Sequence, residues 1–176
     1  MRKPIATISK TSRVKELNQS LKRLQSSIVY VGIAAGSDKD TRVDGGPDNH
    51  LLGFVHEWGS PSANIPPRPF LVPGVESVKD GISQRLESAV ESALKDDQKG
   101  VEDNLEIAGM EAVDGVKTYM TNADFKPLSP RTLENRHRSR NTKSKRTNEL
   151  EGVDVKPLIN TGALRDSVDY IVKKEG

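Results

Sequence analysis

The chain has 176 residues and a formal net charge of +2, with 34% hydrophobic, 30% charged and 4% aromatic residues. This length suits one domain of ordinary size, and the few aromatic residues predict a modest, aliphatic core that draws part of its burial from neighbouring subunits. The absence of cysteine excludes disulfides and thiolate metal sites, and we expect no signal peptide or membrane span because no apolar run is long enough.

The charges are segregated along the chain. Residues 2–23 are basic, residues 76–114 are acidic, and residues 131–146 are basic again with Glu134 as the one opposing acid. Such alternation can steer copies of one chain together, with the basic surface of one facing the acidic surface of the next. The alternative is that these segments are ordinary solvated surfaces.

In chain order, the spacing of apolar residues first predicts a helix over residues 12–25, capped by Thr11 or Ser12. Residues 28–33 form an apolar, β-branched run that is typical of a strand. Residues 35–49 are rich in Gly, Asp and Asn, which favour turns. We expect this stretch to be a long loop that is mobile or used in contacts.

Helical spacing returns in residues 51–58, which are predicted to form a short helix that ends at Gly59. Residues 60–74 then contain five prolines. Each proline removes a backbone donor and pushes the preceding residue toward extended geometry. This segment is therefore predicted to be a stiff extended arm or an edge strand, and not a helix.

Two long helices are predicted over residues 75–94 and 101–120, each with a narrow apolar stripe that contains alanines. Such stripes permit close packing, so we expect the two helices to pair as a hairpin. The following region is polar, with a brief helix predicted at 132–137 and a basic loop at 137–152.

At the end of the chain, Thr161 is expected to cap one helical turn that runs through Arg165. Alternating apolar residues then predict a half-buried strand over 168–172. We expect a single domain over residues 1–176, with flexibility in the N-terminal residues 1–11 and in the two loops.

The sequence contains little that points to catalysis. His56-Glu57 resembles the start of the zinc-protease helix motif, but Ser60 occupies the place of the second histidine. A metal cluster of Asp48, His50 and His56 is possible, although ordinary surface residues are the favoured interpretation. No Gly-x-Ser-x-Gly elbow or phosphate-binding loop occurs. We expect no catalytic residue, metal or cofactor, and keep a small hydrolase that uses His56 and Glu57 as an alternative.

Nucleic-acid binding through the basic residues 131–146 is the stronger alternative, because clustered Arg and Lys side chains neutralise phosphates. No aromatic residue interleaves this stretch, so a base-stacking platform is not expected. No helix-turn-helix or zinc-finger pattern supports sequence readout. Docking of a flexible loop on acidic neighbours is the competing interpretation.

Three pieces of the sequence share an order and spacing with a known family. The first is the run 54–59, with its Glu-Trp-Gly turn, followed by the Pro-Arg-Pro-Phe-Leu arm at 65–71. The second is 127–133 with Arg136 nearby, and the third is 156–167, which contains Leu-Ile-x-Thr-Gly-x-Leu-x-x-Ser. Together these pieces resemble the neck, tail-completion and virion-morphogenesis proteins of long-tailed bacteriophages.

The resemblance implies an α+β subunit in which a small antiparallel sheet packs against two long helices, with an extended proline-rich arm. The chain departs from the family pattern in its loop at 35–49 and in its long basic loop at 137–152. It implies a homo-oligomeric ring, commonly of six copies, at the head-to-tail junction (neck) or at the tail end as a tail terminator. The partners would be the head-closure protein and the tail tube, with passing contact to viral DNA. The protein would be part of the virion, assembled in the host bacterial cytoplasm, with no catalysis, cofactor or membrane.

A proline-rich arm loses little entropy when it docks on a neighbour, which favours its use in subunit contacts. Trp58 and Phe70 are candidate anchors, with the subunit's own core as the alternative for both. Arg68 is expected either to pair with a carboxylate across a subunit boundary or to be solvated. The candidate interface residues are Trp58, Ile65, Pro66, Pro67, Arg68, Pro69, Phe70, Arg136, Arg138 and Arg140.

Overall fold

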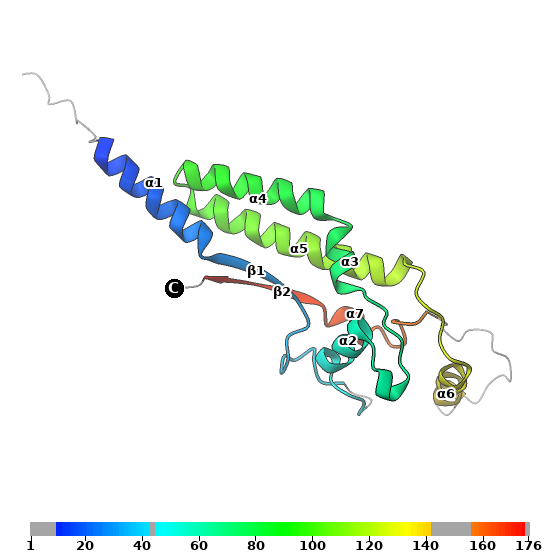
Figure 1. Ribbon diagram of the computed structural model, residues 1–176. Helices are drawn as coiled ribbons and strands as arrows, with labels where there is room; N and C mark the ends of the chain where they lie inside the picture. Colours follow the sequence, from blue (N-terminus) through cyan, green and yellow to red (C-terminus); the bar gives the residue numbers. More distant parts are fainter. Residues whose placement is uncertain (1–9, 43–44, 142–155, 175–176) are drawn as a thin grey trace, which may run out of the picture. The chain divides into compact units, whose positions relative to one another are not determined.

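A computed structural model of the protein describes residues 10–42, 45–141 and 156–174 (Figure 1). The chain divides into two compact units. The first unit takes its described residues from Met1–Val31, Val78–Ala112 and Tyr170–Gly176, and the second from Gly32–Ser77 and Val113–Asp169. The single domain predicted over the whole chain remains a prediction.

The first unit contains the long helices and the sheet. It comprises α1 (Lys10–Gln25), α4 (Lys79–Leu94), the first part of α5 (Gln98–Asn122) and the strands β1 (Ser27–Gly32) and β2 (Asp169–Lys174). In Figure 1, α4 and α5 run antiparallel side by side, and β1 and β2 form a two-stranded antiparallel sheet. None of the described helices combines the length and apolarity that a bilayer crossing requires.

The core of the first unit is small and aliphatic, as the composition predicted. It joins the two long helices to the sheet through the buried residues Ala93, Val101 and Leu105, against which pack Leu24, Val29 and Val172. The predicted α+β fold, with an antiparallel sheet packed against two long helices, is therefore confirmed, as is the helical hairpin.

Part of the acidic character of α5 is neutralised within the same unit. Arg85 Nε donates to Glu111 over 2.8 Å. Lys174 Nζ donates to Glu102 over 2.7 Å, and this hydrogen bond lowers the pKa of the Glu102 carboxyl. Two carboxylates of the acidic segment are thus paired within one subunit, whereas the sequence had suggested that this segment faces the basic surface of another copy.

The second unit is built from short helices around the end of α5. They are α2 (Asn49–Trp58), the 3-10 turn Pro61–Ala63, α3 (Leu71–Glu76), α6 (Pro130–Asn141) and α7 (Ala163–Asp166). Phe70, at 2% exposure, is among the largest of its fully buried side chains. The other buried hydrophobic side chains of this unit are Val113, Val116, Met120, Leu158, Leu164 and Val168.

The predicted proline arm over residues 60–74 is wrong at both ends. Pro61 opens the 3-10 turn, and Pro73 lies in the first turn of α3. A proline at these positions removes an N–H that would have no helical partner, so the helix tolerates it. Only residues 66–70 lie outside any helix, turn or bridge, which leaves a short connection in place of a long arm.

Both predicted N-caps are also wrong. Thr11 and Ser12 lie inside α1, which already includes Lys10. Gly162, with φ of 85°, is the N-cap of α7. Thr161 instead accepts a hydrogen bond of 3.3 Å from the N–H of Ala163 through its Oγ1. A side-chain acceptor near the helix start was correctly expected, but it acts from one residue further out.

The polar region before the C-terminal segment is more helical than predicted. Helix α6 extends to Asn141, so residues 137–141 belong to a helix and not to the predicted basic loop. Residues 142–152 of that loop, and residues 1–9 of the predicted flexible N-terminus, lie outside the described residues.

Gly74 tests how closely α3 and α5 pack. A Cβ at this position would lie 2.6 Å from the Cα of Val116, and backbone cannot move aside as a flexible side chain does. We expect Gly74→Ala to lower the free energy of unfolding by about 1–3 kcal/mol, although alanine is the better helix former. Urea unfolding followed by circular dichroism measures this change.

Gly32→Ala is the control, because a Cβ at Gly32 would meet nothing within 4 Å. We expect it to change the stability by less than about 0.5 kcal/mol. An unchanged or raised stability of Gly74→Ala would contradict the described contact between α3 and α5.

Candidate functional site

The three sequence pieces that resemble the phage family lie together around one cavity in the second unit. The cavity has a volume of about 610 Å³. The first piece contributes Ile65, Pro66 and Arg68, the second contributes Pro127, Leu128 and Ser129 with Arg136, and the third contributes Leu158, Thr161 and Gly162. Segments far apart in the sequence thus form the wall of a single site.

Glu57 joins α2 to the start of α3. Its Oε2 accepts hydrogen bonds from the N–H groups of Phe70 (2.7 Å) and Leu71 (3.0 Å), and its Oε1 accepts one from Val72 (3.3 Å). A helix N-terminus has unpaired N–H donors and a partial positive charge, and a carboxylate satisfies both. This contact joins the Glu-Trp-Gly turn to the Pro-Phe-Leu segment.

Gly59 lets the chain reverse at the end of α2. Its φ is 77°, and a Cβ here would lie 2.9 Å from the backbone N of Pro67. The reversal brings the N–H of Arg68 to the carbonyl of His56 over 2.7 Å. Glycine is therefore required both by the backbone conformation and by the close approach of the following segment.

Arg68 is buried, with only 5% of its surface exposed. Its Nε donates to the carbonyl of Lys126 over 2.7 Å and its Nη2 to that of Pro127 over 2.9 Å. Burial lowers the pKa of the guanidinium below its ordinary value. The predicted solvated side chain is excluded, and the alternative prediction of a carboxylate from a neighbouring subunit remains open.

Arg136, on α6, binds the segment that precedes α7. Its Nη1 donates to the carbonyls of Lys156 (2.9 Å) and Ile159 (3.2 Å), and its Nη2 donates to that of Pro157 (3.1 Å). This arginine therefore binds α6 to residues 156–159, and both segments line the cavity. Arg138 is exposed, and the side chain of Arg140 lies outside the described part of the structure.

His56 lies on the cavity wall between these two arginines. Burial, together with the positive charges of Arg68 and Arg136, lowers the pKa of its imidazole to about 4. His56 is therefore neutral at neutral pH. Its Nδ1 is buried and has no hydrogen-bond partner, so the proton of the neutral ring is best placed on Nε2.

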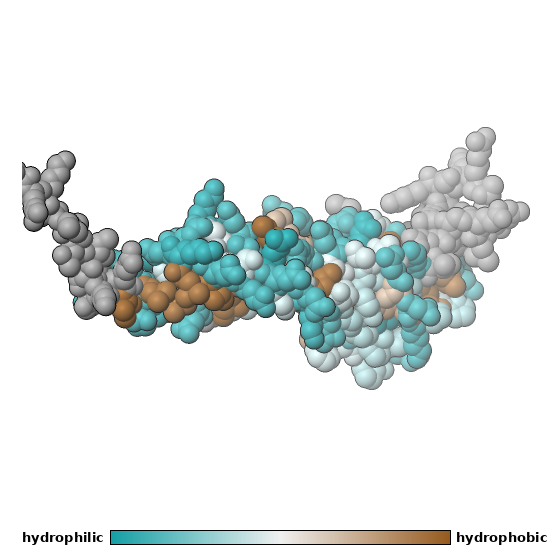
Figure 2. Space-filling model, turned by 90° about the horizontal axis from the view of Figure 1, so that it is seen from above, coloured by the Kyte–Doolittle hydropathy of each residue, from teal (hydrophilic) through white to brown (hydrophobic). Residues whose placement is uncertain are grey.

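Both units expose rows of large apolar side chains along a helix. In the second unit, Leu51, Phe54 and Trp58 recur along α2 and are 50%, 62% and 69% exposed. In the first unit, Leu86, Val90 and Leu94 follow each other along α4 and are also exposed. Figure 2 shows hydrophobic surface over the part of the first unit that carries α1 and α4.

The predicted interface residues therefore separate by exposure. Trp58 is the most exposed of the large hydrophobic residues that the structure describes, so the alternative that it fills the subunit core is wrong. Phe70 is a core residue and is wrongly predicted as a surface anchor. Pro67 and Pro69 are exposed, whereas Ile65 and Pro66 are half-buried in the cavity wall.

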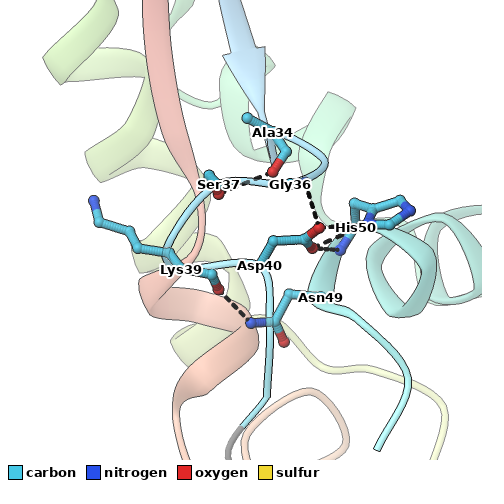
Figure 3. A network of polar contacts seen from close by, with 7 residues as sticks. All are labelled: Ala34, Gly36, Ser37, Lys39, Asp40, Asn49 and His50. Carbon is cyan, nitrogen blue, oxygen red and sulfur yellow. Dashed lines mark hydrogen bonds and ion pairs between the residues drawn. The ribbon is translucent and has the colours of Figure 1, made fainter.

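The loop at 35–49 is organised around the buried carboxylate of Asp40 (Figure 3). Asp40 accepts hydrogen bonds from the N–H of Gly36 (2.7 Å) and the N–H of His50 (2.8 Å), and contacts Nδ1 of His50 at 2.8 Å. Asn49 Nδ2 donates to the carbonyl of Lys39 over 2.7 Å. Burial alone would raise the pKa of Asp40, but these hydrogen bonds outweigh it and lower the pKa.

The cluster of Asp48, His50 and His56, which the sequence left possible but did not favour, is not brought together by the structure. Asp48 and His50 lie instead with Asp40, with one potential ligand atom of each within 4.8 Å of the others. The Asp40 carboxylate is already engaged by backbone N–H groups, and His56 lines the cavity. These hydrogen bonds hold the loop in place and explain why the three residues lie together. No periodic pattern in the sequence indicated this arrangement.

A search for similar proteins found none: no protein-family model, curated protein or solved structure is detectably similar to the chain.

Removing one or both carboxylate oxygens of Glu57 should lower the stability in steps. We expect Glu57→Ala to lower the free energy of unfolding by about 1–3 kcal/mol, because three N–H groups lose their acceptor. Glu57→Gln keeps one acceptor oxygen and should lie between the wild type and Glu57→Ala. Urea unfolding measures all three proteins. Glu76→Ala changes an exposed carboxylate at the other end of α3 and should have little effect; equal losses at the two positions would contradict the capping role.

The low pKa of His56 makes stability depend on pH. The folded protein resists protonation of His56 down to about pH 4, whereas the unfolded chain takes up this proton below about pH 6.5. The contribution is therefore complete above pH 6.5 and is lost as the pH falls toward 4. Between pH 7 and pH 5 we expect His56 to account for a loss of about 2 kcal/mol.

Urea unfolding at pH 7 and pH 5 gives the loss in free energy of unfolding between the two pH values. The difference in this loss between the wild type and His56→Gln is the contribution of His56. The variant should lose less stability than the wild type over this interval. Asn160→Gln, which changes an exposed and non-titrating residue of the same cavity wall, should keep the wild-type dependence. A His56→Gln protein with an unaltered dependence on pH would show that the buried imidazole is not the group responsible.

Proposed function

We propose that the protein is a non-enzymatic structural subunit of a tailed bacteriophage. In this proposal it forms a ring at the head-to-tail junction or at the tail end and joins head and tail during assembly. The resemblance of the three sequence pieces supports the proposal, and so does their meeting around one cavity. The observation that carries the proposal is the exposed apolar surface of α2, formed by Leu51, Phe54 and Trp58.

This surface has the properties of an interface. Large apolar side chains exposed together mark binding sites, and tryptophan is enriched among the residues that dominate binding energy. Trp58 is followed directly by the Gly59 reversal, and its neighbour Glu57 is bound to three backbone N–H groups. The helix that presents Trp58 is thus already ordered, which lowers the entropy lost on association.

A ring needs two different surfaces on each subunit. An interface between unlike surfaces is heterologous, and repeated rotation about such an interface closes into a ring or extends into a filament. The protein exposes one apolar surface on α2 and another on α4. In the proposed ring, the α2 surface of one subunit packs against the α4 surface of the next, and further virion proteins contact the ring.

Nucleic-acid binding is less well supported. Of the basic residues 131–146, Arg136 uses both terminal nitrogens on backbone carbonyls of its own chain. Arg131 and Arg138 are exposed on α6, but Glu134 is exposed beside them. We therefore propose no dedicated nucleic-acid site, and only a passing contact with viral DNA inside the ring.

The virion assignment is tested in a phage that carries the gene. Mass spectrometry of purified particles should detect the chain, and electron microscopy should place it at the neck or at the tail end. An amber mutation should yield separate heads and tails. Complete, infectious particles that contain no copy of the chain would overturn the proposal.

Self-association is tested on the purified protein by sedimentation velocity over a range of concentrations. We expect the double variant Phe54→Ser/Trp58→Ser to weaken association at least tenfold in Kd, which corresponds to about 1.4 kcal/mol or more. Both side chains are exposed, so the melting temperature should barely change. Met110→Ser removes an exposed hydrophobic side chain from α5 and is the matched control. Equal association of both variants and the wild type would exclude the α2 surface as the interface.

A further inference from the structure

The described charged residues that line the cavity in the second unit are all cationic. Four cationic side chains line it, namely Arg42, Arg68, Lys126 and Arg136, and the lining includes no Asp or Glu among the residues that the structure describes. His56, on the same wall, is neutral at neutral pH and does not balance the charge. An anion that enters this cavity therefore meets a positive potential, which no carboxylate among the described lining residues opposes.

Arg68 is the most informative of these residues. A buried charge is costly unless it is paired, yet both printed partners of its guanidinium are neutral carbonyls, and the described residues offer it no carboxylate. Nη1 donates no hydrogen bond to the described residues. The buried side-chain atoms without a partner in that part of the chain are Asn49 Oδ1 and His56 Nδ1, so Arg68 Nη1 keeps contact with solvent.

The guanidinium groups are also held in place before any ligand binds. The carbonyls of Lys126 and Pro127 fix Arg68, and those of Lys156, Pro157 and Ile159 fix Arg136. A fixed guanidinium loses little side-chain entropy when it binds an anion, and its planar donors match a carboxylate. The site is therefore ordered for a ligand that the subunit itself does not supply among its described residues.

The rest of the cavity wall decides what carries the anion. Aliphatic residues and prolines make up much of it, including Leu52, Ile65, Leu128 and Leu158, and no Phe, Tyr or Trp is among the described residues that line it. Sites for single-stranded nucleic acid combine a cationic groove with large aromatic side chains on which successive bases stack, and these described lining residues do not supply such a surface. A peptide that alternates acidic and aliphatic side chains fits both parts of the wall.

We propose that this cavity is a binding site for an acidic peptide segment of a partner protein, with a Glu or Asp carboxylate bound at Arg68 and Lys126 and an aliphatic side chain against Leu128 and Leu158. The inference goes beyond the proposed virion role and stands on the cavity alone. It assigns Arg68 a ligand-binding role in addition to its contacts with the chain segment at 126–127.

Isothermal titration calorimetry on the full-length protein tests this proposal. The probe is an acetylated, amidated pentapeptide of alternating leucine and glutamate, and the comparison is the same peptide with glutamine in place of glutamate. We expect the glutamate peptide to bind at least tenfold more tightly, and its affinity to fall as salt is added. Equal affinity of the two peptides, or tighter binding of single-stranded DNA than of the glutamate peptide, would overturn the proposal.

Variants locate the binding. Arg68→Gln should weaken the glutamate peptide at least tenfold, and Lys126→Gln, at an exposed lysine of the wall, at least threefold without loss of fold. Arg138→Gln removes an exposed arginine of α6 that does not line the cavity, and should leave the affinity unchanged. If Arg68→Gln does not fold, the contrast between Lys126→Gln and Arg138→Gln decides. Equal weakening by those two variants would mean that the peptide binds the basic surface and not the cavity.

Nuclear magnetic resonance gives an independent readout. Binding should shift the methyl signals of Leu128 and Leu158 and raise the pKa of His56, because a bound carboxylate offsets the charges of Arg68 and Arg136. Methyl shifts confined to Leu51, on the exposed surface of α2, would place the peptide at the other apolar surface and overturn the proposal.

Discussion

The carboxylate of Glu57 holds the second unit in its described form, because it binds the end of α2 to the start of α3. Without those three hydrogen bonds, the N-terminus of α3 would leave backbone donors unpaired beside the buried Phe70. The same contact fixes the short connection at 66–70 from which Arg68 reaches the cavity. One ion–backbone contact thus positions a helix, a core aromatic residue and a binding group.

Two arginines extend this construction by binding backbone carbonyls. Arg68 and Arg136 hold two separate loops against the same cavity, and the described residues of its wall include no Asp or Glu. A fold selected for stability alone would pair or replace a buried guanidinium. The retained positive charge is easier to understand if an acidic ligand completes the site.

The two units contribute differently to the proposed assembly. The first unit satisfies several of its charges internally, as in the pairs Arg85–Glu111 and Lys174–Glu102, and leaves an aliphatic strip along α4. The second unit presents the apolar surface of α2 and the cationic cavity. In the proposed ring, apolar packing would supply most of the affinity between subunits, and charge would guide partners to the cavity.

The sequence by itself determined the long helices, because their apolar periodicity extends over several turns and is insensitive to distant contacts. It also determined both strands, one from a β-branched apolar run and one from alternating apolar residues, and with them the α+β class. It misplaced the proline segment, because the start of α3 is fixed by Glu57, which precedes Leu71 by 14 residues. It also misplaced the helix caps, because a neighbouring residue can supply the acceptor, as Thr161 does for Ala163 from outside the N-cap position. It also identified the three pieces that line the cavity, but not that they meet.

Only the tertiary structure decided that Phe70 is buried and Trp58 exposed, since both are large aromatic residues in apolar runs. Their burial depends on which neighbouring segments cover them, and short-range patterns do not carry that information.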